Sequence, residues 1–218
     1  MKKLVVAIDG PAGAGKSTVA QLAAKELGYT YIDTGAMYRA VAWKVLHQGG
    51  EVTDEAILAV VPDIDVDLSY EQGRTTVRVD GEDVTDEIRT PAVSHIVSKV
   101  AALGPVREKM VALQRKMAER GGVLMDGRDI ATNVLPNADV KIYLTASIEE
   151  RAKRRCKELC EKGMDVKLED IQRDIAARDK ADMEREISPL VQADDAALLD
   201  TTGLTIPEVV AKIVGMCR

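Results

Sequence analysis

Eight residues constrain the fold of this sequence more than any others, the glycine-rich segment from Gly10 to Ser17 (GPAGAGKS). They match G-x-x-x-x-G-K-[ST] and lie between an apolar run at 3–8, typical of a buried strand, and a helical pattern at 17–27. In this context the glycines let successive backbone N–H groups point at phosphate oxygens, and the positive end of the helix adds to the attraction. We therefore expect this segment, the phosphate loop, to bind a nucleoside triphosphate. The residues expected to contact it are Gly10, Pro11, Ala12, Gly13, Ala14, Gly15, Lys16, Ser17 and Thr18.

Strand-like and helix-like segments alternate along most of the chain. Further core strands are predicted at 29–32, 123–125, 140–144 and 197–199. Helices are predicted at 36–46, 91–101, 106–120 and 168–186, with others opened by Ser147-x-x-Glu150, ending near Gly163, and by Thr205. Two short runs at 64–68 and 75–79 interrupt the alternation and predict a small antiparallel insert. The pattern indicates an α/β fold, a parallel sheet with helices on both faces.

The composition excludes several classes of protein. The 218 residues are 46% hydrophobic and 30% charged, so one soluble globular domain needs no disulfide or structural metal. A formal charge of −6 and only 3% aromatic residues argue against a nucleic-acid surface with base-stacking platforms. No apolar run is long enough to span a membrane, and Met1-Lys2-Lys3 leads directly into a short strand, so we expect a cytoplasmic location.

The three cysteines do not indicate a metal site. Cys156 and Cys160 lie four residues apart on a predicted helix, but zinc usually needs three or four protein ligands, and His47 and His95 are distant in sequence. We interpret the thiols as structural.

Lys16, Ser17 and Asp126 are the residues predicted to bind the triphosphate and its Mg²⁺ ion. Lys16 supplies a positive charge for the β- and γ-phosphates, and the Ser17 hydroxyl is a ligand for Mg²⁺. Asp126 ends a buried strand and is a second candidate for the Mg²⁺ site, although Asp126-Gly127 is also a common turn dipeptide. The Asn-Lys-x-Asp pattern by which GTPase switches read guanine is absent from the sequence. An oligomeric ATPase remains open.

Basic residues gather in two predicted helices near the C-terminal third of the chain. Arg151, Arg154 and Arg155 share one helix face, where like charges repel unless an anion lies between them. Arg178, Asp182 and Arg185 share a face of the next helix. Two such faces would close over a triphosphate and stabilise charge during phosphoryl transfer. The alternative is a solvated helical hairpin with ordinary ion pairs such as Arg178–Asp182.

Five segments together resemble the bacterial cytidylate kinase family, in the same order and over nearly the whole chain. They are GPAGAGKST, DTGAMYR (33–39), DGRD (126–129), RAKRR (151–155) and RDxxDxxR (178–185). The resemblance implies a P-loop nucleoside-monophosphate-kinase fold: a single domain with a five-stranded parallel sheet, a monophosphate-binding insert at about 63–90 and a helical lid at about 151–185. It implies the reaction of ATP with CMP or dCMP to give ADP and CDP or dCDP, with Mg²⁺, in pyrimidine nucleotide metabolism. We expect a monomer.

The resemblance also implies roles for individual residues. Cytosine would be read by Ser98, Arg107 and Asp129. The CMP phosphate would be held by Arg39 and Arg128, since a planar guanidinium matches two phosphate oxygens. The ribose and phosphate edge would meet Thr34, Arg178 and Asp182, with Asp182 at a sugar hydroxyl. Transition-state charge would be stabilised by Lys16, Arg155, Arg178 and Arg185, with Arg154 as a further candidate.

Two positions depart from the family pattern, and other functions remain open. Thr34 stands where relatives often have Ser. Ala131 stands where they often have Gly, so that any turn needing positive φ there would be strained. The alternatives are a P-loop kinase for UMP, AMP or shikimate, or a nucleotide switch that binds ATP without transferring phosphate.

Overall fold

A five-stranded parallel sheet forms the centre of the protein. The computed structural model describes residues 3–71, 73–161 and 163–218. The sheet has the order β2-β6-β1-β7-β8, and every neighbouring pair is parallel. In that order the strands are Thr30–Asp33 (β2), Val123–Gly127 (β6), Val5–Asp9 (β1), Val140–Thr145 (β7) and Ala197–Asp200 (β8). The predicted fold class and all five predicted core strands are confirmed.

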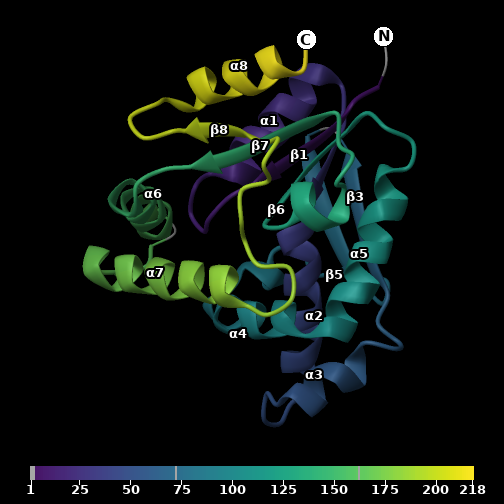
Figure 1. Ribbon diagram of the computed structural model, residues 1–218. Helices are drawn as coiled ribbons and strands as arrows, with labels where there is room; N and C mark the ends of the chain where they lie inside the picture. Colours follow the sequence, from purple (N-terminus) through teal and green to yellow (C-terminus); the bar gives the residue numbers. More distant parts are fainter. Residues whose placement is uncertain (1–2, 72, 162) are drawn as a thin grey trace.

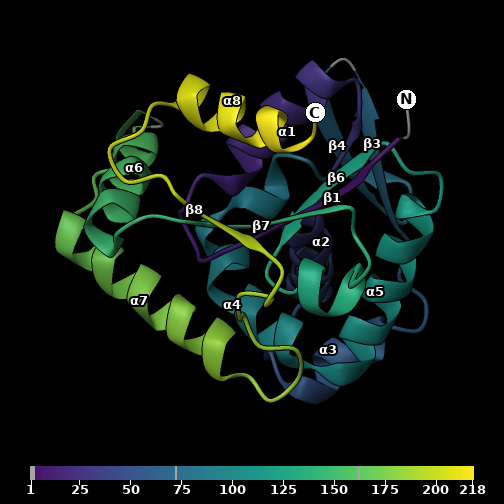
Figure 2. The same ribbon diagram turned by 45° about the horizontal axis from the view of Figure 1, so that its top comes forward.

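Helices cover both faces of this sheet. Successive side chains of a strand point to opposite faces, and here both sets are apolar. Val6 and Ile8 of β1 pack under the helices of one face, whereas Ala7 points to the other. Figures 1 and 2 show α1 and α8 together on one face, and α2 and α5 on the other. These four helices are Lys16–Leu27 (α1), Thr34–Gln48 (α2), Gly104–Ala118 (α5) and Ile206–Met216 (α8).

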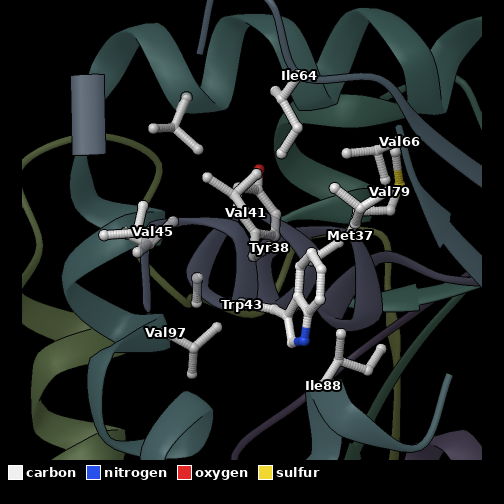
Figure 3. Close-up of a cluster of buried hydrophobic side chains, with 14 of the residues drawn as sticks. Met37, Tyr38, Val41, Trp43, Val45, Ile64, Val66, Val79, Ile88 and Val97 are labelled. Atoms are coloured by element: carbon white, nitrogen blue, oxygen red, sulfur yellow. The ribbon is translucent and has the colours of Figure 1, made fainter. Parts of the chain in front are cut away.

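A second apolar core surrounds α2. Trp43, Val45 and Met37 lie among side chains from the small antiparallel sheet and the neighbouring helices (Figure 3). The elements packed there are Asp54–Val60 (α3), Val66–Glu71 (β3), Arg74–Val79 (β4), Glu87–Arg89 (η1) and Pro91–Ala102 (α4). The short strand Glu82–Asp83 (β5) pairs with β4, and both of its residues are exposed. The antiparallel insert is therefore confirmed. The sequence reasoning missed α3, β5 and η1.

Two helices lie beside the carboxyl edge of the sheet. They are Ile148–Glu161 (α6) and Leu168–Glu184 (α7), and they pack against each other (Figure 2). Ala152, Ile171 and Ile175 form a small apolar core between them. Both helices were predicted, although α7 ends two residues earlier than expected.

A short π-helix, Ile130–Val134 (η2), follows β6 and was not predicted. Ala131 lies buried within it and is not among the residues with positive φ, so no turn there requires glycine and the backbone is not strained. The three cysteines are free thiols, and within the described ranges we find no group of three or more His, Cys, Asp or Glu side chains that could hold a metal. None of the helices in the described ranges has the length and apolarity needed to cross a membrane.

Candidate active site

Three buried aspartates lie at the carboxyl ends of neighbouring strands. β1 ends at Asp9, β2 at Asp33, and Asp126 is the penultimate residue of β6. The carboxyl ends of parallel strands meet at one sheet edge, which is where α/β proteins bind ligands. Asp33 caps α2 by accepting from Ala36 N at 2.9 Å, and its other oxygen accepts from Arg89 Nη2 at 3.0 Å.

Asp9 holds the unpredicted π-helix in place. Its two oxygens accept hydrogen bonds from the backbone N–H groups of Ile130 and Ala131, both at 2.8 Å. Burial raises the pKa of Asp9 to about 6, although these two hydrogen bonds oppose the shift. Asp9 thus fixes the segment that begins just after Asp129.

The phosphate loop has the geometry that its sequence predicts. Gly13 and Gly15 have φ of +72° and +83°, in the left-handed region that favours glycine. A Cβ at Gly10 would overlap the Leu144 carbonyl oxygen, so the chain can turn there only with glycine. The Lys16 ammonium donates to the carbonyl oxygens of Gly10 at 2.7 Å and Pro11 at 2.9 Å, and burial lowers its pKa. A lysine ammonium held within a glycine-rich loop suits a polyphosphate.

Ser17 and Asp126 are brought together as the sequence reasoning expects. The Ser17 hydroxyl donates to Asp126 Oδ2 at 3.0 Å, and Tyr31 OH donates to Asp126 Oδ1 at 2.8 Å. Mg²⁺ takes oxygen ligands and typically uses one or two protein groups, with water and substrate phosphates completing its shell. A hydroxyl and a carboxylate at the sheet edge, without a larger cluster, fit that requirement.

A cavity beside the phosphate loop collects eight of the predicted residues. It is lined by Thr34, Ser98, Arg107, Arg128, Asp129, Arg178, Asp182 and Arg185. These residues come from α2, α4, α5, the end of β6 and α7, which lie far apart in sequence. Gly127 also lines the cavity, and Asp126 before it accepts from Ser17 of the phosphate loop, so the cavity lies next to this loop.

One end of the cavity holds a buried ion pair between Arg107 and Asp129. Both side chains are almost fully buried, and Arg107 Nη2 donates to Asp129 Oδ2. Asp129 also accepts from Asn133 Nδ2 at 3.0 Å and from Arg185 Nη2 at 3.4 Å, while Arg107 Nη1 donates to the Ala101 carbonyl oxygen at 3.2 Å. This end can present a carboxylate and guanidinium donors to a ligand with both acceptors and donors on its edge.

The other end of the cavity is strongly cationic. Arg128 Nε donates to Asp182 Oδ2 at 2.8 Å, and Thr34 Oγ1 donates to the Asp126 carbonyl oxygen at 2.7 Å. Burial and the charge of Arg128 lower the pKa of Arg178 to about 10. Both guanidinium groups stay charged at neutral pH, so they repel each other until an anion binds.

Arg39 does not line the cavity but belongs to the same charged group. Its guanidinium donates to the Ile88 carbonyl oxygen at 3.2 Å and to Ser94 Oγ at 2.8 Å. Burial and the charge of Arg178 lower the pKa of Arg39 to about 9, and Arg155 adds a smaller repulsion. Arg155 itself lies at the surface of α6 and pairs with Glu158 at 2.7 Å.

Arg151, Arg154 and Arg155 each pair with an acidic side chain in this structure. Arg151 is buried and pairs with Asp179 at 2.6 Å, whereas Arg154 pairs with Glu150 at 3.1 Å and donates to Thr201. Neighbouring cations on one helix face are stable here because each has its own protein acceptor. Asp182 likewise pairs with Arg128.

Four residues around the cavity were missed by the sequence reasoning. Tyr38 lines it, and the Arg107 guanidinium lies 5.6 Å from the centre of the Tyr38 ring. Gln114 is buried, and in the described part of the chain both its amide atoms, like the Tyr38 hydroxyl, have no hydrogen-bond partner. Asn133 and Asp9 act through the π-helix. Of these four residues, Gln114 could have been identified from the sequence, because it is a polar residue on the apolar face of the helix predicted at 106–120.

The comparisons of this sequence with a family model and with known proteins agree on one family. The family model described as cytidylate kinase matches residues 6–218. A cytidylate kinase of Bacillus licheniformis is 55% identical over 215 residues, covering 98% of this chain and 95% of the relative. A cytidylate kinase of Bacillus thuringiensis is 52% identical over 216 residues, covering 99% and 96%.

Solved structures of distant sequence share the fold. A gluconokinase from Sinorhizobium meliloti aligns with a TM-score of 0.51 at 14% identity, covering 98% of this chain and 90% of that one. An uncharacterised protein from Eubacterium ventriosum aligns with a TM-score of 0.54 at 11% identity, covering 98% and 97%. At these identities the likeness concerns the fold alone.

Proposed function

This chain belongs to the cytidylate kinase family, and we propose that it transfers the γ-phosphoryl group of ATP to CMP and dCMP, yielding ADP and CDP or dCDP. The observation that carries the proposal is the buried Arg107–Asp129 pair at the end of a cationic cavity beside the phosphate loop. One end of that cavity suits a base and the other a phosphate, which are the two ends of a nucleoside monophosphate.

The base end favours cytosine over the other bases. Cytosine carries an exocyclic amine donor next to the N3 and O2 acceptors. Asp129 would accept from the amine, and Arg107 and Ser98 would donate to the acceptors. Uracil presents a carbonyl oxygen where cytosine has the amine, so that the Asp129 carboxylate would repel it.

The phosphate end would hold the CMP phosphate between Arg128, Arg178 and Arg39. Burial and, to a smaller extent, the neighbouring guanidinium groups lower the pKa values of Arg178 and Arg39, and a phosphate dianion there would offset the repulsion. Asp182, now an acceptor for Arg128, has a second oxygen for a sugar hydroxyl, and Thr34 lies beside it at the cavity wall. We propose that residues 63–90 act as the monophosphate-binding insert and residues 151–185 as a lid.

Catalysis in this arrangement depends on positioning and charge. In-line phosphoryl transfer needs no enzyme nucleophile, because an acceptor oxygen held in line attacks the γ-phosphorus directly. Lys16 would stabilise charge on the β- and γ-phosphates, and Arg155 and Arg178 would stabilise the equatorial oxygens as ADP leaves. Arg185, which donates to Asp129 at the base end in this structure, would join them by leaving that contact. Mg²⁺, which Ser17 and Asp126 would hold, neutralises charge on the phosphate oxygens when it is bound.

An acceptor panel tests the proposal. ADP release is measured with CMP, dCMP, UMP, AMP and GMP at matched concentrations, with shikimate as a non-nucleotide acceptor. CMP and dCMP are expected to give the highest kcat/KM. Turnover of AMP or UMP equal to that of CMP would refute the assignment of the base end to cytosine. ADP release without any acceptor, unchanged by CMP, would favour the alternative of a nucleotide switch.

A further inference from the structure

A buried contact joins α6 and α7 to the phosphate loop, and the reaction described above does not use it. Asp179 Oδ1 accepts from the backbone N–H of Ala12 at 3.0 Å, and Arg151 Nη1 donates to the carbonyl oxygen of Ala12 at 2.8 Å. Arg151 Nη1 also donates to Asp179 Oδ2 at 2.6 Å. One ion pair thus holds both polar groups of a single phosphate-loop residue. We refer to Arg151, Asp179 and the Ala12 backbone as the clamp.

The clamp is fixed from its other side as well. Arg151 Nε donates to the Ala146 carbonyl oxygen at 2.9 Å, just before α6 begins. Arg151 and Asp179 are 7% and 8% exposed, so water competes little for these hydrogen bonds. Ala12 lies 139 positions before Arg151 and 167 positions before Asp179 in the sequence. Arg151 and Asp179 are 28 positions apart.

Packing beside the clamp leaves little free space. A Cβ at Gly13 would lie 3.3 Å from Ile175 Cδ1 of α7 and 3.5 Å from Arg151 Cβ of α6. The next loop carbonyl, that of Ala14, faces Arg154 Nη1 at 3.5 Å. Movement of α6 and α7 away from the sheet would therefore pull directly on the Ala12–Ala14 segment of the loop.

Electrostatics explain why a carboxylate can lie next to a site for polyphosphate. An unpaired Asp179 would repel the triphosphate, but Arg151 neutralises it at 2.6 Å, and its charge is used to fix the Ala12 N–H. An ion pair of this burial contributes little net stability compared with apolar residues of similar volume. Its directional hydrogen bonds do set the orientation of the Ala12 peptide.

We propose that Arg151 and Asp179 are positioning residues of the phosphate loop. They hold the Ala12 peptide in the orientation that aligns the following loop amides on the phosphates, and they couple the loop to the position of α6 and α7. Neither residue touches the reacting atoms. The inference rests on the proposed function only in that the loop binds the phosphates of ATP or ADP.

The test compares Asp179→Asn with Asp170→Asn, a matched control on the same helix. Asp170 is exposed and pairs with Arg173, away from the loop. Asparagine at 179 keeps the size of the side chain but removes the charge that pairs with Arg151. ADP affinity is measured by calorimetry without any acceptor, and KM for ATP and for CMP by ADP release.

The clamp predicts a split between the two substrates. Asp179→Asn is expected to weaken ADP binding and raise KM for ATP by about tenfold or more, with KM for CMP within about twofold of the control. Arg151→Met is expected to have a similar effect, and the double variant to lose less than the product of the two single losses, because the two residues pair with each other and hold the backbone of the same residue, Ala12.

Two results with Asp179→Asn would overturn the proposal. ADP affinity of Asp179→Asn equal to that of Asp170→Asn would overturn it, as would an equal rise in both KM values. If Asp179→Asn does not fold, Arg151→Met provides the same comparison, and exchange of the Ala12 amide in the unaltered protein provides a second one. Rapid exchange of that amide would overturn the proposal. ADP binding needs no acceptor, so these results are independent of whether the acceptor is CMP.

Discussion

Replacement of Asp129 by alanine should separate stability from base recognition. In the folded protein Asp129 accepts hydrogen bonds from Arg107, Asn133 and Arg185. The variant leaves the Arg107 guanidinium, 3% exposed, with no opposing charge and with the Ala101 carbonyl oxygen as an acceptor. Removal of one partner from a buried ion pair typically costs about 3–5 kcal/mol.

This loss in the free energy of unfolding is large but should leave the variant folded. Domains of ordinary stability unfold with roughly 5–15 kcal/mol, so Asp129→Ala should still fold. At about 2–4 °C per kcal/mol for a chain of this size, Tm should fall by about 6–20 °C. A lost hydrogen bond to a charged acceptor is worth about 1.5–3 kcal/mol, so kcat/KM for CMP should fall roughly 10- to 150-fold while KM for ATP changes by less than about twofold.

The double variant Asp129→Ala/Arg107→Met is the control. It removes the uncompensated charge together with the carboxylate, so Tm should recover most of the loss. Turnover of CMP should not recover, because the carboxylate that reads the base is still absent. Calorimetric unfolding and ADP release on the same preparations supply both quantities. The reasoning is refuted if Asp129→Ala weakens ATP and CMP binding equally, or if the double variant is no more stable than the single one.

Three further predictions concern the charged groups of the site. Lys16→Met should lower kcat by at least about 100-fold, as ADP release would show, and unchanged turnover would exclude the role assigned to Lys16. CMP should raise Tm more than cytidine does, and Arg178→Met should reduce that difference; equal shifts with both ligands would mean that the arginines do not bind the phosphate. Because burial raises the pKa of Asp9 from 3.8 to about 6, its contribution to stability is complete below pH 3.8 and is lost as pH rises through 6. A pKa raised by about 2 corresponds to about 3 kcal/mol in total. Between pH 4 and 6.5 most of this develops, so the free energies of unfolding of the unaltered protein and Asp9→Asn should change relative to each other by about 2 kcal/mol; a constant difference would contradict this.

The sheet and the phosphate loop were predictable because short-range patterns determine them. The strand before Gly10 is an apolar run, the helix that follows the loop buries Val19, Ala20, Ala23 and Ala24 at helical spacing, and the loop needs glycine at positions that the sequence fills with glycine. The π-helix at Ile130–Val134 has no comparable sequence pattern, since it depends on Asp9, more than 120 residues earlier, to hold its first two N–H groups.

The candidate site residues could be named from the sequence, most of them through the family resemblance, but their pairings could not. The structure brings eight of the candidates into one cavity. Which charge pairs with which depends on tertiary packing. Asp182 meets Arg128 rather than Arg178, and Arg151 turns inward to Asp179, two contacts that helix periodicity alone could not reveal.

The central claim is that this site passes a phosphoryl group directly from one nucleotide to another. The most direct measurement follows the label from ATP carrying ³²P in its γ-phosphate, in the presence of CMP and Mg²⁺. The account predicts that the label appears in the β-phosphate of CDP, one for each ADP formed, and that Lys16→Met abolishes both products together. Release of the label as inorganic phosphate, with ADP formed but no labelled CDP, would contradict it.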